Sequence, residues 1–308
     1  MAHEHHHGHH GAGHSHAPAS FGAAFAIATA LNLALVIVQV IYGLAANSLA
    51  LLADAGHNFG DCLGLMLAWG AHVLARRQPT TRFTYGYGSA SILSALVNAV
   101  TLLVATGGIA WEAIRRLGDP GQVTGGTIIV VAATGLLVNG ISAWLLMSGR
   151  KGDLNIRGAF LHLVGDAAVS AAVVVAGIVI LLTGWTLADP IASLVVAAAI
   201  LWSSWSLLRE SFRLSLDAVP AGIDPQAVRV FLESLSGVTS THDLHIWAVS
   251  TTGTALTCHL VMPGGHPGDA FLASTCRELE RHFAINHATF QIELGDADIC
   301  RLEPEHVV

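Results

Sequence analysis

SLALLADAGHNFGDCLGLMLAWGA, residues 48–71, is long enough to cross a lipid bilayer as one helix, yet it carries His57 and Asp61 near its middle. A bilayer core of about 30 Å is spanned by roughly 20 apolar residues in a helix. Residues four apart lie one turn apart on the same helix face. Ionisable side chains inside a span are costly and normally face a bundle interior or a water-filled cavity. The stretch therefore predicts a membrane helix with one polar, inward-facing side.

A second apolar stretch repeats this pattern. AFLHLVGDAAVS, residues 159–170, carries His162 and Asp166, again four apart. If the two faces meet, two imidazoles and two carboxylates converge, and zinc accepts such ligands at about 2.0–2.2 Å in a tetrahedron. Mixed nitrogen and oxygen ligands suit zinc, cobalt or iron better than calcium or magnesium. The alternative is that each pair is a buried hydrogen bond that only locks helices together.

The composition agrees with a membrane protein. Only 11% of the 308 residues are charged, against about 25% in soluble domains, and the mean hydropathy is +0.60. No basic run with interleaved aromatic residues occurs, so nucleic acid is not an expected partner. We expect six membrane-spanning helices, near residues 21–46, 50–75, 88–115, 125–148, 159–184 and 190–209.

The distribution of arginine and lysine predicts the orientation. Six spans place both ends of the bundle on one side, and the side richer in Arg and Lys is cytoplasmic. Eight such residues follow the second, fourth and sixth segments, whereas the opposite side has two, Arg115 and Arg116. We therefore expect both termini in the cytoplasm. The eight are Arg76, Arg77, Arg82, Arg150, Lys151, Arg157, Arg209 and Arg213.

The two ends of the chain differ from the apolar middle. Residues 1–20 contain eight of the 18 histidines and favour a disordered, metal-catching tail, with an expression tag as the alternative. The expected membrane domain covers 21–210 and a distal α+β domain covers 211–308. In the distal part, helices are expected near 224–236 and 267–284, and strands near 240–250, 253–262 and 287–294. This order suits a small domain of the ferredoxin-like kind.

Several segments together resemble the cation diffusion facilitator family, and in particular its zinc-transporting branch. They are SLALLADAGHNFGDCLGLMLAWGA (48–71), RFTYGYGSASILSALVNA (82–99), AFLHLVGDAAVS (159–170), ADPIASL (188–194) and THDLHIWAVS (241–250). The resemblance implies a homodimer in the cell (inner) membrane, with six spans and a cytoplasmic ferredoxin-like domain in each subunit. It also implies export of divalent metal from the cytoplasm, usually against protons, with the central site at His57, Asp61, His162 and Asp166. Histidine at position 57 is typical of zinc-selective members.

The resemblance also implies metal ligands in the distal domain. They map onto His242, His259, His287 and Glu293, and Cys300 and His306 could add further ligands. On an ideal strand His242 and His245 fall on opposite faces, so at most one of them is expected in a given site. The alternative is that these are surface or packing histidines. A further family site after the second span is expected to be missing, since residues 76–86 contain no His, Asp, Glu or Cys.

The function expected is zinc transport by alternating access, without a cofactor and without enzymatic activity. Ligands must lose protons to bind metal, and histidine titrates near neutral pH, so exchange of zinc for protons is the accompanying hypothesis. Two other classes remain as alternatives. A membrane metalloenzyme would need an element such as HExxH beside an open zinc position, and HExxH is absent. A zinc sensor or storage protein would not need six membrane-spanning helices.

Overall fold

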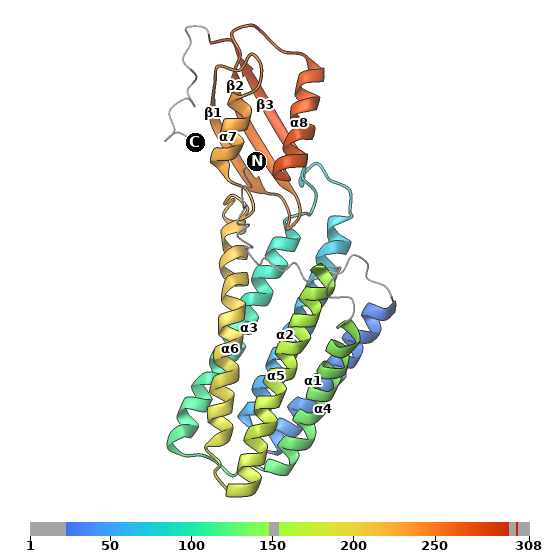
Figure 1. Cartoon of the computed structure of the whole chain (residues 1–308), viewed down its shortest axis with the longest axis vertical. Helices are drawn as coiled ribbons and strands as arrows, with labels where there is room; N and C mark the ends of the chain where they lie inside the picture. The colour runs from blue at the N-terminus through green and yellow to red at the C-terminus, as the bar shows by residue number, and fades with distance from the viewer. Residues whose placement is uncertain (1–22, 148–153, 296–299, 301–308) are drawn as a thin grey trace, which may run out of the picture. The chain divides into compact units, whose positions relative to one another are not determined.

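Six long helices make up the first two thirds of the chain. The computed structural model describes residues 23–147, 154–295 and 300. Figure 1 shows the long helices as extended, roughly parallel ribbons. Their bounds lie close to the predicted ones, although α6 runs further than expected. They are α1 Ala23–Ala45, α2 Leu49–Ala75, α3 Ala90–Gly118, α4 Gly125–Leu146, α5 Leu154–Thr183 and α6 Ala188–Ser215.

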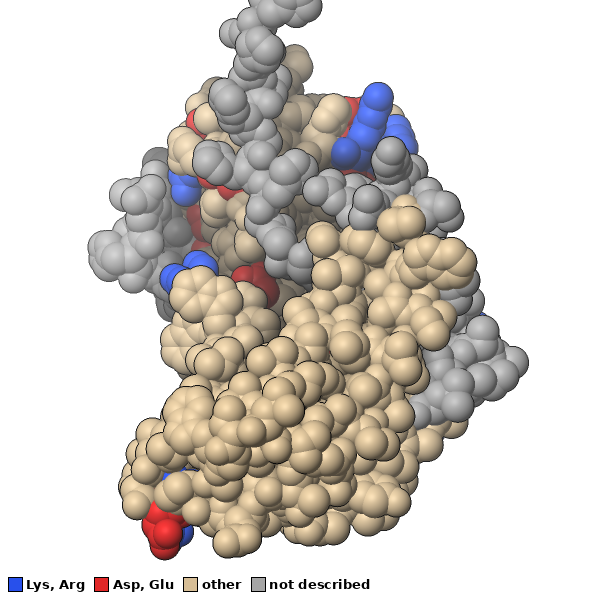
Figure 2. All heavy atoms as spheres, turned by 60° about the horizontal axis from the view of Figure 1, so that its bottom comes forward, with Lys and Arg blue, Asp and Glu red and all other residues tan. Residues whose placement is uncertain are grey.

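The apolar character of these helices identifies a membrane domain. Within the described residues, α3, α4, α5 and α6 are each long and apolar enough to span a bilayer, and α1 has a shorter apolar stretch from Asn32 to Ala45. The helix α2 is also long, but its histidines, aspartates and asparagine lower its hydropathy. On the face turned forward in Figure 2, the described side chains of the long helices are almost uncharged apart from one small group at the lower edge.

The start of α2 is fixed by a carboxylate from α6. Asn47 turns the chain with a φ of 53°, and the Ser48 hydroxyl accepts a hydrogen bond from the Leu51 amide as the helix cap. The buried Asp189 carboxylate accepts hydrogen bonds from the Ser48 hydroxyl and from the Leu49 amide. A negative charge at a helix amino terminus is favourable. Asp189 therefore ties the beginning of α6 to the beginning of α2.

Small residues let the helices approach closely. Along α2, Gly60 and Gly64 face α3, where a Cβ atom would lie 2.7 Å from Leu102 and 2.8 Å from Asn98 respectively. Between α4 and α5, a Cβ on Gly125 would lie 2.8 Å from the Gly177 carbonyl oxygen. Close contact through small residues is the usual means of helix association in lipid. These glycines bring α3 close to the side of α2 that also carries His57 and Asp61.

The distal part is an α+β domain with its own core. It contains α7 Pro225–Glu233, β1 Ser240–Ala248, β2 Thr254–Val261, α8 Asp269–Phe283 and β3 His287–Glu293, which agrees with the predicted order. The sheet order is β1-β2-β3, with β1 and β2 antiparallel and β2 and β3 parallel. Leu232 of α7, Leu279 of α8 and Leu256 of β2 are fully buried in one hydrophobic cluster. Both helices therefore pack into the same core as the sheet.

Candidate metal centre

The structure brings the two predicted His–Asp pairs together between α2 and α5. His57 Nε2 lies 3.0 Å from Asp166 Oδ1 and 4.0 Å from Asp61 Oδ2. His162 Nε2 lies 3.5 Å from Asp61 Oδ2 and 3.5 Å from Asp166 Oδ2. The two imidazole rings stand 6.4 Å apart with the carboxylates near both of them. One ligand atom each from His57, Asp61 and Asp166 lies within 4.8 Å of the others, a spacing that suits one bound cation.

A hydrogen bond joins His57 of α2 to Asp166 of α5. An imidazole nitrogen and a carboxylate oxygen only approach to 3.0 Å when a proton lies between them, because both are otherwise acceptors. In the neutral ring this proton sits on Nε2 in one tautomer and on Nδ1 in the other, and a metal ion that binds Nε2 requires the second. Within the described residues the buried Nδ1 atom of His57 has no hydrogen-bond partner.

The distal domain holds a second cluster of ligand atoms. His242, His259, Glu293 and Cys300 each place one within 4.8 Å of the others. His259 Nδ1 lies 3.0 Å from Glu293 Oε1 and 3.2 Å from His242 Nε2. The Cys300 sulfur lies 3.6 Å from His259 Nδ1. The sheet register produces most of this arrangement, since His242 pairs with His259 across β1 and β2, and Glu293 ends the adjacent strand β3.

Asp243, which was not predicted from the sequence, orients the ring of His259. Its Oδ2 atom lies 3.3 Å from His259 Nε2, so the other ring nitrogen is the one that faces Glu293 and Cys300. Such carboxylate–histidine contacts fix the tautomer and the ring orientation at metal sites. Asp243 has a φ of 52°, at a bulge where the register of β1 against β2 shifts between His242 and His245. The sequence HDLH places Asp243 next to His242, but on a regular strand the Asp243 side chain would point away from His242 and His259.

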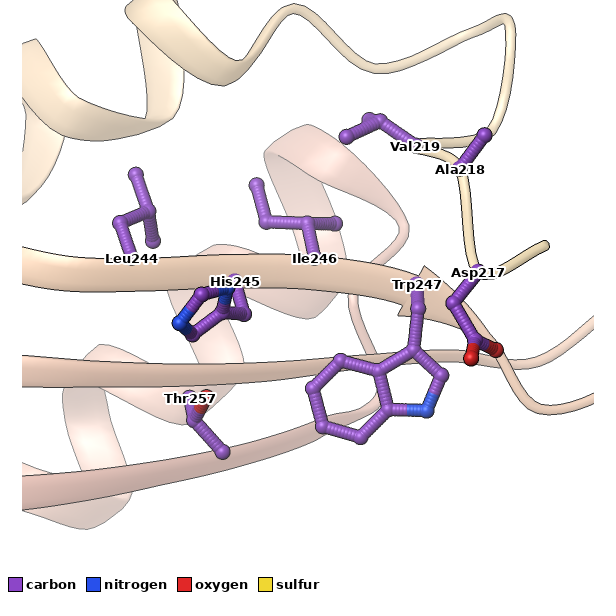
Figure 3. Close-up of a pocket in the computed structure, with 8 residues that line it drawn as sticks. All are labelled: Asp217, Ala218, Val219, Leu244, His245, Ile246, Trp247 and Thr257. Atoms are coloured by element: carbon purple, nitrogen blue, oxygen red, sulfur yellow. The ribbon is translucent and has the colours of Figure 1, made fainter. Parts of the chain in front are cut away.

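His245 lies outside the cluster, as expected of one of the two β1 histidines. Its Nε2 atom is 2.9 Å from the other oxygen of Asp243. Figure 3 shows a shallow pocket where His245 and Trp247 project to one side of β1 and Leu244 and Ile246 to the other. The pocket is lined by Asp217, Ala218, Val219, Leu244, His245, Ile246, Trp247 and Thr257. It contains none of the four clustered ligand residues.

His287 is the one predicted distal ligand that the structure does not bring into the cluster. It is the first residue of β3 and pairs with Ala255, six residues along the strand from Glu293. Its ring packs edge-on against Tyr85, with centroids 5.4 Å apart. Cys300 takes the place in the cluster that the sequence-based set gave to His287. His306 and the histidines of residues 1–20 lie outside the described residues.

Two groups of the distal domain have shifted pKa values. Burial opposes ionisation of Glu293, but hydrogen bonds from Gln291 and Cys300 and the charges of His242 and His259 hold its pKa below the usual value. Glu293 is therefore a carboxylate at neutral pH and suits a cation. Burial raises the pKa of the Cys258 thiol to about 12. Cys258 thus stays a neutral core residue beneath the cluster.

The fold defines a multi-pass membrane protein that gathers imidazole and carboxylate side chains between α2 and α5 and a second such cluster on its distal sheet. Comparison with known proteins identifies its family. Residues 25–214 match the cation efflux transmembrane domain, and residues 220–294 match the cation efflux protein cytoplasmic domain. The chain belongs to the cation efflux family, whose members are transport proteins and not enzymes.

Three relatives illustrate the similarity. The chain is 39% identical over 260 residues to the zinc transporter ZitB of Escherichia coli strain K12, covering 84% of this chain and 83% of that protein. It is 36% identical over 263 residues to a cadmium, cobalt and zinc/H(+)-K(+) antiporter of Bacillus subtilis, covering 84% of each. It is 35% identical over 264 residues to the metal cation efflux system protein CzcD of Cupriavidus metallidurans, covering 85% of this chain and 84% of that protein.

Proposed function

We propose that this chain exports zinc from the cytoplasm by alternating access, with His57, Asp61, His162 and Asp166 holding the ion in transit. The observation that carries the proposal is the convergence of two imidazoles and two carboxylates from α2 and α5. Zinc favours this mixed set in a four-coordinate shell. The names of the relatives, which include zinc transporters, support zinc as a substrate.

Proton exchange is the second part of the proposal. The hydrogen bond between His57 Nε2 and Asp166 Oδ1 uses two atoms that would bind a metal ion. Metal ligands must be deprotonated, so metal binding expels protons from any imidazolium or carboxyl group at the site, and proton return favours metal release. The Bacillus relative is named as an antiporter that involves H(+), which supports the same coupling in this chain.

Zinc flux into proteoliposomes tests both parts. Purified protein is reconstituted with an entrapped zinc-sensitive dye and, in parallel, with an entrapped pH dye. We expect zinc entry to be accompanied by proton exit and to speed up when the interior is made acidic. Zinc flux that neither moves protons nor responds to the pH gradient would refute the exchange. Absence of zinc flux under every gradient would refute the transport proposal itself.

We further propose that the bundle has both termini in the cytoplasm of a bacterial cell and lies in the inner membrane. The eight-to-two distribution of Arg and Lys supports this orientation. The two opposing arginines have structural partners, since both pair with Glu112 and Arg116 also donates to the Asn47 carbonyl at the α1–α2 turn. Labelling of single introduced cysteines with an impermeant maleimide tests it. Labelling of the 76–86 loop from outside intact cells would contradict it.

We also propose that the protein is a homodimer and that the distal domain binds a regulatory metal ion. The match to the cation efflux cytoplasmic domain and the family resemblance support the dimer, and light scattering of the purified protein tests it. The cluster of His242, His259, Glu293 and Cys300 supports the metal site. In a variant lacking the transport ligands and residues 2–17, His259→Ala is expected to abolish the remaining zinc binding, whereas His287→Ala is expected to leave it unchanged. Loss of this zinc binding in His287→Ala but not in His259→Ala would show that His287, and not His259, belongs to the site.

A further inference from the structure

The polar contact between α2 and α5 extends one helical turn beyond the proposed transport site. The two helices run antiparallel, and three successive pairs of side chains connect them. Towards the amino-terminal end of α2, the ladder ends with a carboxylate and a hydroxyl that no ligand prediction included. The pairs are Asp61–His162 at 3.5 Å, His57–Asp166 at 3.0 Å and Asp54–Ser170 at 3.1 Å.

Exposure decreases steadily along this ladder. The side chains of His162 and Asp61 are 35% and 23% exposed, whereas Asp54 and Ser170 are 1% and 0% exposed. The ladder is therefore most exposed towards the carboxyl-terminal end of α2 and fully buried towards its amino-terminal end, where Asp54 lies.

Two other helices complete the closure around Asp54. Gln39 of α1 donates a hydrogen bond of 2.7 Å from its Nε2 to Asp54 Oδ2, and it accepts one of 3.1 Å from Asn58. On α4, a Cβ atom at Gly135 would lie 3.1 Å from the Ser170 hydroxyl and 3.4 Å from Gln39 Nε2. The backbone of α4 therefore lies directly against the network, and a side chain at position 135 would press on Ser170 and Gln39.

The composition of this network suits a contact that opens and closes. Packed aliphatic side chains alone would suffice to hold four helices together. Here a buried carboxylate is held by neutral amide and hydroxyl donors, and water can replace each of those donors when the helices separate. Such side chains cost little to expose, since their hydrogen bonds are exchanged for hydrogen bonds to water. Asp54 and Ser170 also follow His57 and Asp166 directly in the series of contacts between α2 and α5.

We propose that Asp54, Ser170, Gln39 and Asn58 form the gate that closes the transport site towards the amino-terminal end of α2. Asp54 is its positioning residue, because its carboxylate is the acceptor that joins α1 to α5. The inference rests on the proposed transport function and adds the group that separates the site from the far side. Opening breaks the Asp54–Ser170 and Asp54–Gln39 contacts together and admits water, protons and the departing ion along the same polar face.

Thiol accessibility tests the gate. In a variant with the four native cysteines replaced by serine, Ser170→Cys introduces a thiol of similar size at the closed end of the ladder. A membrane-impermeant methanethiosulfonate is added from the side of the α1–α2 turn, with and without zinc and a pH gradient. We expect no labelling at rest and at least tenfold faster labelling during transport. As a matched control, the thiol of Ser193→Cys, at a buried site on α6 outside the network, should remain unlabelled in both conditions. Asn58→Cys provides a second site if Ser170→Cys does not fold.

A second measurement tests the role of Asp54. Asp54→Ala removes the acceptor of both the Gln39 and the Ser170 hydrogen bonds, so the contact that joins α1 to α5 is lost. The four proposed ligands are untouched, and we expect the equilibrium affinity for zinc to stay within threefold of the wild type. Labelling of the Ser170→Cys thiol at rest should rise at least tenfold in this background. An unchanged resting rate would show that Asp54 does not hold the gate.

The outcomes separate this inference from the proposed function. A wild-type protein without zinc flux would refute the transport proposal. Normal zinc flux in the Ser170→Cys variant, with the thiol unreactive throughout turnover, would refute the gate alone and leave the network as a static lock between helices. Equal labelling of the Ser170→Cys and Ser193→Cys thiols would also refute it, because general loosening of the bundle would then explain the reaction.

Discussion

Removal of the Asp166 carboxylate is expected to abolish zinc transport without unfolding the protein. Asp166 makes the shorter contacts to the two imidazoles, with His57 Nε2 at 3.0 Å and His162 Nε2 at 3.5 Å, whereas Asp61 lies 4.0 Å and 3.5 Å from them. Its side chain is only 8% exposed, so water does not readily take its place. The change Asp166→Ala therefore removes one anionic ligand and leaves two imidazoles and one carboxylate around the ion.

The size of the effect follows from the burial of this group. Removal of one partner from a buried charged contact costs about 2–5 kcal/mol of binding free energy, and a loss of about 3 kcal/mol corresponds to more than a 100-fold loss of affinity. At a zinc concentration of about 100 times the wild-type Kd, binding stabilises the wild type by about 2.7 kcal/mol. With a 100-fold weaker Kd, the same concentration stabilises the variant by only about 0.4 kcal/mol. Zinc should therefore raise the Tm of the wild type clearly and that of the variant barely.

The assay combines flux with thermal unfolding. Both proteins carry His259→Ala, so that zinc binding to the distal cluster does not contribute. Asp166→Asn separates loss of charge from loss of volume and should also fail to transport. Asp119→Ala, which removes an exposed carboxylate in the α3–α4 connection, is the matched control and should transport normally. If Asp166→Ala retained more than a tenth of the wild-type flux, the proposed site would be wrong.

Three further predictions concern other parts of the chain. Because burial raises the pKa of Cys258 to about 12, only about one Cys258 thiol in ten thousand is ionised at pH 8. Maleimide should therefore react with Cys276 of the native protein well before it reacts with Cys258. The opposite order would show that Cys258 is not buried. Gly177→Leu should destabilise the bundle by about 1–3 kcal/mol and lower its Tm, since a Cβ atom at position 177 would lie 2.9 Å from the Ile129 side chain. The control Gly107→Leu should leave the Tm unchanged, because no atom lies within 4 Å of a Cβ atom at position 107. Deletion of residues 2–17 should lower zinc flux without abolishing it, and complete loss would show that the tail is essential.

The local periodicities of the sequence were enough to predict the elements of the fold. Apolar runs of sufficient length predicted the long helices, and the polar stretch after them predicted the α-β-β-α-β order that the structure has. The boundary at α7 could also be predicted, because Asp224 caps the helix by accepting from the Gln226 amide. Each of these features depends on residues within a few positions of one another.

The proposed transport ligands were predictable for the same local reason. His57 and Asp61 share one helix face, as do His162 and Asp166, and the cost of burying such pairs in lipid indicated that the two faces meet. The distal ligands were harder to predict because they come from three strands and a following segment. His287 and Cys300 exchange roles in the structure, since β-sheet register, and not spacing along the chain, decides which side chains meet.

The sequence by itself determined which segments enter the membrane and which helix faces carry metal-binding groups, because helical periodicity and the cost of burying charge act over a few neighbouring residues. Only the tertiary structure decided what surrounds Asp54. Its partners Gln39 and Ser170 come from different helices, 15 and 116 positions away, and the space for them depends on a glycine of a third helix. Contacts of this kind depend on how the helices pack, which no local pattern records.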